Sequence, residues 1–413
     1  MHDKYGEVVR LAPDQLSFTS VEATNDEDHA RHRRLLAHAF SDKALREQEP
    51  LINKYVSLLV AKLSDVTQSA LAVDMVRMYN YCTFDIMGDL AFGEPLGLLE
   101  QSDYTPWVAA IFGTIKTGVL IATITNNFPT LGAAIRRFCI PAALVEKRAT
   151  HRRFAEARVD ARLANAAHTE RPDIWTFVLR HAASDAGKGL RLEEMHADGS
   201  TLMVAGTETT ATLLSGLTYH LLRNPDKLRA LATEIRDAFA RPEDMDMASL
   251  ARLPYLHACL EEGLRMYPPV PVGLPRIVPA GGRVVCGKPV PQGTSVYLSH
   301  YAAYRSARNF CEPDAFVPER WLGRDGDEGE GEGRRDPKYA GDVLAVVEPF
   351  SYGPRNCIGK NLAYHEMRLI LANVLWHFDL DLCPESKDWM DQEVYTIWEK
   401  GPLMCKLKPV VRD

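Results

Sequence analysis

Ten residues near the C-terminal end, from Phe350 to Gly359, constrain the fold of this chain more than any other stretch. Gly353 and Pro354 favour a tight turn. Apolar residues at helical spacing resume at Leu362, so a helix is expected to follow the turn. Cys357 is therefore expected where a turn meets the beginning of a helix.

That position suits an anionic sulfur. Unpaired backbone N–H groups and the positive end of a helix lower the pKa of a thiol and stabilise the thiolate. We expect the N–H groups of Ile358 and Gly359 to face the sulfur of Cys357, and Gly359 to let the backbone come close. The alternative is a buried, inert thiol, which is how most single intracellular cysteines behave.

Composition excludes several classes of protein. The net charge of −7 argues against a nucleic-acid partner, because phosphate binding requires a basic surface. The eight cysteines are too sparse for a disulfide scaffold, and none form a Cys-x-x-Cys pair, so a zinc cluster is unsupported.

No linker divides the chain, which we interpret as one domain, residues 1–413. Residues 324–342 are charged and poor in apolar side chains, which predicts a mobile surface loop.

The rest of the chain is patterned mainly as helices. Residues 5–19 alternate apolar and polar side chains, which predicts a short hairpin. Helical spacing dominates from about residue 29 to 270. Strand-like segments return at 276–278, 283–285 and 295–298. The expected fold class is mainly α with a small β subdomain (α+β).

A predicted long helix, residues 192–222, contains Ala205-Gly-Thr-Glu-Thr-Thr210. Glycine and consecutive threonines are poor helix formers, so we expect a local distortion there. Thr209 lies four residues after Ala205, and its hydroxyl can compete for that carbonyl. The simpler interpretation is that Ala205 and Gly206 permit close helix packing.

Two further charged pairs lie on helical faces. Glu262 and Arg265 are three residues apart, which is consistent with either an exposed salt bridge of little value or a buried pair. His29 and Arg33 are four apart on another helix. They either hold a carboxylate together or form a solvated basic face.

These motifs occur in the order found in one family. The ten-residue stretch matches Phe-x-x-Gly-x-Arg-x-Cys-x-Gly, a pattern expected by chance in about one of ten thousand chains of this length. The chain resembles the cytochrome P-450 family of haem-thiolate monooxygenases, and more narrowly its fungal secondary-metabolism members. The resemblance implies haem b (iron protoporphyrin IX) between the long oxygen-binding helix and the cysteine-loop helix. Cys357 would be the axial thiolate and metal ligand, and Phe350 would pack near its sulfur.

The resemblance also assigns roles to other residues. Ala205 and Gly206 would make room above the iron, while Glu208 and Thr209 would relay protons as the catalytic acid and alcohol. Arg320 would complete a buried core with Glu262 and Arg265. The cofactor-binding residues implied by the family are Cys357, Phe350, Gly353, Arg355, Ile358, Gly359, His29, Arg33, Arg276, Ala205 and Gly206. Of these, the expected propionate ligands are His29, Arg33, Arg276 and Arg355.

The implied reaction inserts one oxygen atom from O2 into a lipophilic small molecule, giving hydroxylation, epoxidation or desaturation. Electrons would come from NADPH through a cytochrome P-450 reductase, with cytochrome b5 as a further candidate partner and a monomer as the expected state. Lys360, Arg355 and Arg368 are the candidate docking residues. One alternative is a haem-thiolate isomerase or dehydratase, and another is an inactive, truncated haem-binding product.

Two family segments are expected but not found in the sequence. Eukaryotic members begin with a membrane anchor, which implies the cytosolic face of the endoplasmic reticulum membrane for a full-length form. Between Phe18 and His29 the family inserts a few dozen residues that this chain lacks. The most apolar stretch, residues 107–125, carries Lys116 at its middle, so we expect a buried or interfacial helix there.

Overall fold

The computed structural model describes residues 9–12, 15–18, 27–69, 71–104, 106–128, 130, 142–165, 172–182, 189–323 and 336–411. The chain forms two compact units. The first comprises residues 1–27, 66–73 and 212–413, and the second comprises 28–65 and 74–211. Each has its own buried apolar side chains. The single domain over 1–413 stays a prediction.

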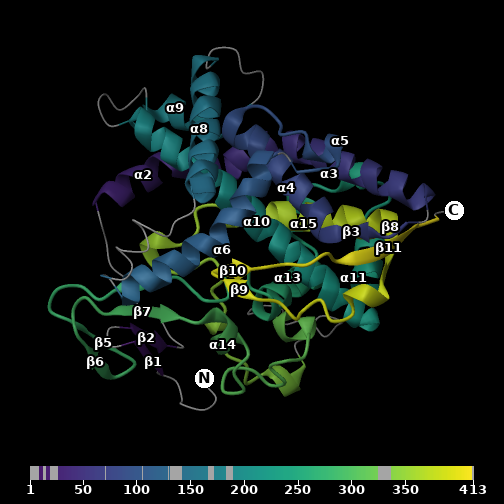
Figure 1. The fold of residues 1–413 in the computed structure, drawn as a ribbon. Coiled ribbons are helices and arrows are strands. Elements are labelled where there is room, and N and C mark those ends of the chain that lie inside the picture. Colours follow the sequence, from purple (N-terminus) through teal and green to yellow (C-terminus); the bar gives the residue numbers. More distant parts are fainter. Residues whose placement is uncertain are drawn as a thin grey trace. The chain divides into compact units, whose positions relative to one another are not determined.

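The second unit is helical (Figure 1). Its elements are α2 (Glu27–Ala37), the 3-10 helix η1 (His38–Phe40), α3 (Asp42–Gln68), α4 (Met75–Phe92), α5 (Leu98–Gln101), α6 (Pro106–Asn127), α8 (Ala142–Ala164), α9 (Ile174–Ala182) and the first part of α10 (Leu192–Arg223). Helix α4 is buried at every position except Arg77. Asp74 caps its first turn by accepting a hydrogen bond from the N–H of Val76, and Gly93, with a φ of 74°, ends it. Helix α4 contacts α8 and α9, so it forms the centre of this unit.

The first unit contains the end of α10 and the remaining helices. These are α11 (Pro225–Ala238), η2 (Pro242–Asp244), α12 (Met247–Leu250), α13 (Pro254–Met266), α14 (His300–Tyr304), η3 (Pro318–Trp321), η4 (Pro337–Tyr339), η5 (Leu344–Val346), η6 (Gly353–Arg355), α15 (Lys360–His377) and η7 (Pro384–Ser386). Pro225 and Pro254 begin α11 and α13, where a missing N–H costs nothing. Helix α15 packs against α11, α12 and α13, which places it in the core of this unit.

Small sheets complete the first unit. The largest has the order β1-β2-β7-β4, from β1 (Val9–Ala12), β2 (Gln15–Phe18), β7 (Ser295–Leu298) and β4 (Arg276–Ile277). A second sheet has the order β3-β11-β8, from β3 (Val73–Asp74), β11 (Met404–Pro409) and β8 (Phe378–Leu382). Two-stranded sheets pair β5 (Arg283–Val285) with β6 (Lys288–Val290), and β9 (Val394–Tyr395) with β10 (Ile397–Trp398).

The structure confirms most of the predicted elements. Strands β1 and β2 pair antiparallel, as the alternation in residues 5–19 predicts. The three later strand segments form β4, β5 and β7, and α10 covers the predicted long helix. The fold is mainly α with a small β part, as expected. In the described part of the chain, no helix is long and apolar enough to cross a membrane.

The predicted mobile loop is described only at its C-terminal end. Residues 324–335 lie outside the described residues. In the part from Asp336 onward, Tyr339 and Asp342 are buried. Asp342 therefore belongs to the packed part of the first unit.

Candidate functional site

The loop before α15 is held by its own backbone. The N–H of Cys357 donates to the carbonyl of Phe350 over 2.7 Å, and the N–H of Asn356 donates to the carbonyl of Gly353 over 3.0 Å. Gly353 adopts a φ of 77°, a conformation that glycine reaches at little cost. The predicted turn is thus confirmed, and Cys357 lies three residues before the first residue of α15.

Cys357 is exposed, unlike most of the described cysteines. Cys82, Cys259, Cys383 and Cys405 are buried, and burial raises the pKa of the Cys259 thiol well above its ordinary value. A buried thiol of that kind is inert. Cys357 is not buried, so the alternative of a buried thiol is wrong.

The aromatic ring predicted to lie near the sulfur belongs to a small cluster. The Phe350 and Tyr364 rings lie 5.3 Å apart between centroids, and the Lys360 ammonium lies 5.7 Å from the Phe350 centroid. The Arg368 guanidinium stacks on Tyr364 at 5.2 Å. Phe350 is only partly buried, so it is not an ordinary core side chain.

Two arginines lie at the cysteine loop, Arg355 within it and Arg276 bonded to it. Arg276 on β4 donates to the hydroxyl of Ser351 over 2.9 Å, which ties it to the loop. Burial, and then the positive charge of Arg355, lower the pKa of Arg276. An anion near both guanidiniums would offset their mutual repulsion. The donor set fits a carboxylate, such as a haem propionate.

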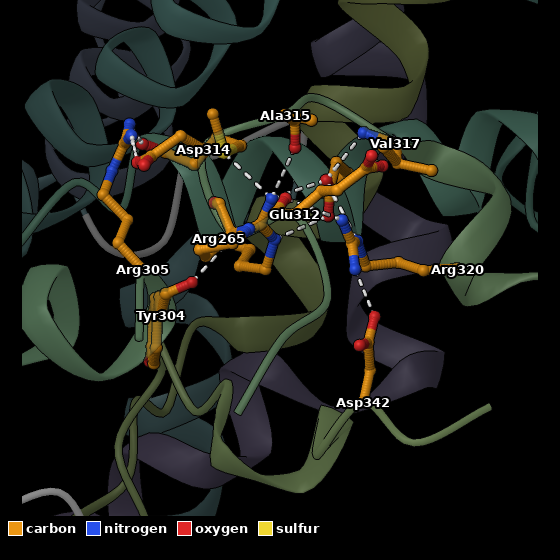
Figure 2. A network of polar contacts seen from close by, with 12 residues as sticks. Arg265, Tyr304, Arg305, Glu312, Asp314, Ala315, Val317, Arg320 and Asp342 are labelled. Carbon is orange, nitrogen blue, oxygen red and sulfur yellow. Dashed lines mark hydrogen bonds and ion pairs between the residues drawn. The ribbon is translucent and has the colours of Figure 1, made fainter. Parts of the chain in front are cut away.

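The first unit also contains a buried ion network (Figure 2). Arg265 donates to both carboxylate oxygens of Glu262, over 2.7 and 2.8 Å, and Arg320 donates to one of them over 3.2 Å. All three side chains are fully buried. The exposed salt bridge considered for Glu262 and Arg265 is therefore wrong, and the buried pair with Arg320 is confirmed.

The network has members that the sequence did not reveal. Asp342 pairs with the Arg320 guanidinium, and the Trp321 indole donates to Glu262 over 2.8 Å. Burial alone would raise the pKa of Glu262, but the positive charges of Arg265 and Arg320 keep it below its ordinary value. Asp342 was missed because it falls at the end of a charged, apolar-poor segment. No signal in the sequence distinguishes its carboxylate from the others there.

In the second unit, α10 presents the predicted small and hydroxylated residues. The Thr209 hydroxyl donates to the carbonyl of Ala205 over 2.7 Å, as expected from their spacing. A Cβ at Gly206 would lie 2.7 Å from the sulfur of Met87 on α4, so Gly206 does permit close helix packing. Ala205 is exposed and Thr209 partly exposed, whereas Glu208 is buried. Ala205 and Thr209 thus share one open face of α10.

Helix α2 carries the remaining two predicted residues. His29 and Arg33 lie one turn apart, and both are partly exposed. This partial exposure is compatible with both interpretations, a carboxylate held by the two residues and a solvated basic face. The roles of all these residues toward a cofactor stay predictions.

Comparison with known proteins decides the family. Residues 15–405 match the family model described as Cytochrome P450. This chain belongs to the cytochrome P450 family. The family and fold imply a haem-thiolate cofactor.

Curated relatives of this P450 are fungal. It is 43% identical to cytochrome P450 monooxygenase efuB of Hormonema carpetanum, over 100% of this chain and 86% of the relative. It is 44% identical to cytochrome P450 monooxygenase FUM2 of Gibberella moniliformis, over 98% and 90%. It is 41% identical to averantin hydroxylase of Dothistroma septosporum, over 99% and 81%. The efuB alignment extends over 448 residues, against 413 in this P450, so efuB carries residues within the aligned region that this chain lacks.

A solved structure supports the fold. The crystal structure of the cytochrome P450DA heme domain superimposes with a TM-score of 0.75 at 20% identity, over 92% of this P450 and 77% of that chain. At this identity the match shows the fold alone.

Proposed function

We propose that this P450 is a haem-dependent monooxygenase that inserts one oxygen atom from O2 into a lipophilic small molecule, with Cys357 as the axial ligand. The observation that carries the proposal is the exposed Cys357 in a loop closed by its own backbone. When bound, haem with an axial thiolate supplies the oxidative chemistry. The fungal relatives named as monooxygenases support the same reaction class.

The remaining residues would bind and orient the cofactor. Arg276 and Arg355 would hold one propionate, because their charges lie close enough to repel each other. His29 and Arg33 would hold a propionate from α2. Phe350 would pack beside the thiolate, and the turn at Gly353 would set the path of the loop.

Two residues of α10 would handle protons. The Thr209 hydroxyl donates to the Ala205 carbonyl, so its oxygen is held on the open face of the helix with lone pairs that can accept a proton or a hydrogen bond. Glu208 immediately precedes Thr209 in the sequence, and its carboxyl is buried. This carboxyl would supply the proton that passes to the Thr209 oxygen. Ala205 leaves space on the same face.

The partners follow from the family. Electrons would come from an NADPH-cytochrome P450 reductase, with cytochrome b5 as a further donor. Lys360, Arg355 and Arg368 would form the basic docking surface. The protein would lie on the cytosolic face of the endoplasmic reticulum membrane, as the family implies.

The deciding experiment is the reduced, carbon-monoxide difference spectrum of the haem-loaded protein. We expect a strongly red-shifted Soret band that disappears in Cys357→Ser. Cys286→Ser is the matched control, because Cys286 is exposed but lies in the turn between β5 and β6. A band typical of neutral ligation, or no haem uptake, would overturn the proposal.

A further inference from the structure

Helix α2 is anchored unevenly along its length. Its apolar residues Leu35 and Leu36 are buried near the C-terminal end. From His29 to Arg34, every residue is partly or fully exposed. The half of α2 that carries His29 and Arg33 therefore gains little from apolar burial, and polar contacts must hold it in place.

One carboxylate provides such contacts. Glu194, in the first turn of α10, accepts hydrogen bonds from the Arg31 guanidinium over 2.7 Å at one oxygen and 3.3 Å at the other. The His32 ring nitrogen Nε2 lies 3.2 Å from the same carboxylate. Arg31 also donates to the carbonyl of Gly189 over 3.3 Å. A two-pronged guanidinium contact fixes orientation as well as distance.

Glu194 is itself rigidly held. The backbone N–H and the side chain of Arg191 donate to it over 2.7 to 3.0 Å, and only 8% of the residue is exposed. The hydrogen bonds from Arg31, and then from Arg191, keep the pKa of Glu194 well below its ordinary value. Its carboxylate is thus charged at neutral pH and cannot turn toward solvent without breaking several bonds.

A second carboxylate lies one turn further along α10. Asp198 Oδ2 lies 3.5 Å from His32 Nδ1, so the imidazole lies between two acidic side chains. On α2, Arg31 projects from the side opposite to His29 and Arg33, because two residues cover a little over half a turn. Arg31 therefore faces away from the predicted propionate-binding residues, whereas His32 lies about 60° around the helix from His29.

We propose that Glu194 is a positioning residue: by holding Arg31 and His32, it orients α2 so that His29 and Arg33 can bind a haem propionate. This inference rests on the proposed function of His29 and Arg33. Glu194 contacts Arg31 and His32 and acts through the helix. Loss of its charge releases the exposed half of α2 and speeds haem loss.

The test measures the rate of haem transfer from the ferric protein to excess apomyoglobin. For Glu194→Gln we expect haem loss to be faster by about tenfold or more. Replacing a residue that orients a cofactor-binding side chain has an effect of this size in metal sites. Asp160→Asn is the matched control. Asp160 on α8 lies 2.7 Å from His196, which belongs to the same segment of α10 as Glu194. The variant therefore removes the charge from a contact of that segment that does not involve α2. The control should lose haem at the wild-type rate.

Two further variants separate positioning from general destabilisation. In an Arg33→Leu background, Glu194→Gln should add little, since the ligand it positions is already gone. Arg31→Leu should reproduce Glu194→Gln, and the double variant should lose haem no faster than either. A wild-type rate for Glu194→Gln, or a full additional effect in the Arg33→Leu background, would overturn the inference. Absence of a red-shifted carbon-monoxide band in the wild type would instead overturn the proposed function.

Discussion

Replacing Glu262 by glutamine should strongly destabilise the first unit. The carboxylate accepts hydrogen bonds from Arg265, Arg320, the backbone N–H of Val317 and the indole of Trp321. Glutamine keeps the shape but loses the charge, which leaves two fully buried guanidiniums without the carboxylate that they share. Asp342 still pairs with Arg320. Breaking one side of a buried ion pair costs about 3 to 5 kcal/mol. We expect a loss in that range.

Urea unfolding followed by tryptophan fluorescence measures this loss. The matched control is Asp314→Asn, which breaks the Arg305–Asp314 pair in the same region (Figure 2). Asp314 is 80% exposed, so its replacement should change the free energy of unfolding by less than about 1 kcal/mol. If Glu262→Gln does not fold, Asp342→Asn tests the same network at its Arg320 end. A Glu262→Gln protein as stable as the control would refute the reasoning.

The pH dependence of the same network has a definite sign. The pKa of Glu262 is lower in the folded protein than its ordinary value, because Arg265 and Arg320 outweigh the effect of burial. Its contribution to stability is therefore present above the ordinary carboxyl pKa, and it is lost as the pH falls through the folded value. The urea midpoint of the wild type should fall in acid more steeply than that of Glu262→Gln.

Four other outcomes are expected. Cys357→Ala should abolish the red-shifted carbon-monoxide band, and its persistence would exclude this cysteine as the ligand. Thr209→Ala should keep haem bound but divert electrons from product to hydrogen peroxide; unchanged product formed per NADPH would contradict the proton assignment. Gly206→Val should cost about 1 to 3 kcal/mol in urea unfolding, since its Cβ would meet Met87, and Met87→Ala should restore part of the loss. Burial lowers the pKa of His220 to about 3 in the folded protein. The stabilisation by its neutral form is therefore complete above about pH 6.5, the ordinary histidine pKa, and is lost as the pH falls toward about 3. His220→Phe should make the urea midpoint fall less between pH 7 and pH 5.

Much of the architecture follows from local sequence patterns. The turn at Gly353, the helix α10 and the strands β4, β5 and β7 depend on residues only a few positions apart. The hydrogen bond from Thr209 to Ala205 is of the same kind. Helical spacing, turn chemistry and side-chain competition for the backbone act over such distances, so the sequence predicts them directly.

The candidate site was predictable for a different reason. The cysteine loop is a contiguous pattern, and the spacing of its residues carries the chemistry. By itself, the sequence determined which cysteine is the candidate ligand and which α10 residues accompany it. It did not determine whether Glu262 is exposed or buried, because the same spacing occurs in both cases.

Only the tertiary structure decided the long-range partners. The charged residue that pairs with Arg320 is Asp342, and the one that pairs with Arg31 is Glu194, 163 positions away in the chain. The sequence around Asp342 or Glu194 does not identify the arginine that each one binds, because many carboxylates on protein surfaces have similar neighbouring residues. The Arg320–Asp342 pair forms where packing has removed water from both charges, and burial makes an unpaired charge too costly there. The Arg31–Glu194 pair forms where folding brings α2 next to α10. The helices and the cysteine loop are therefore properties of local sequence, whereas the contacts that orient them are properties of the folded chain.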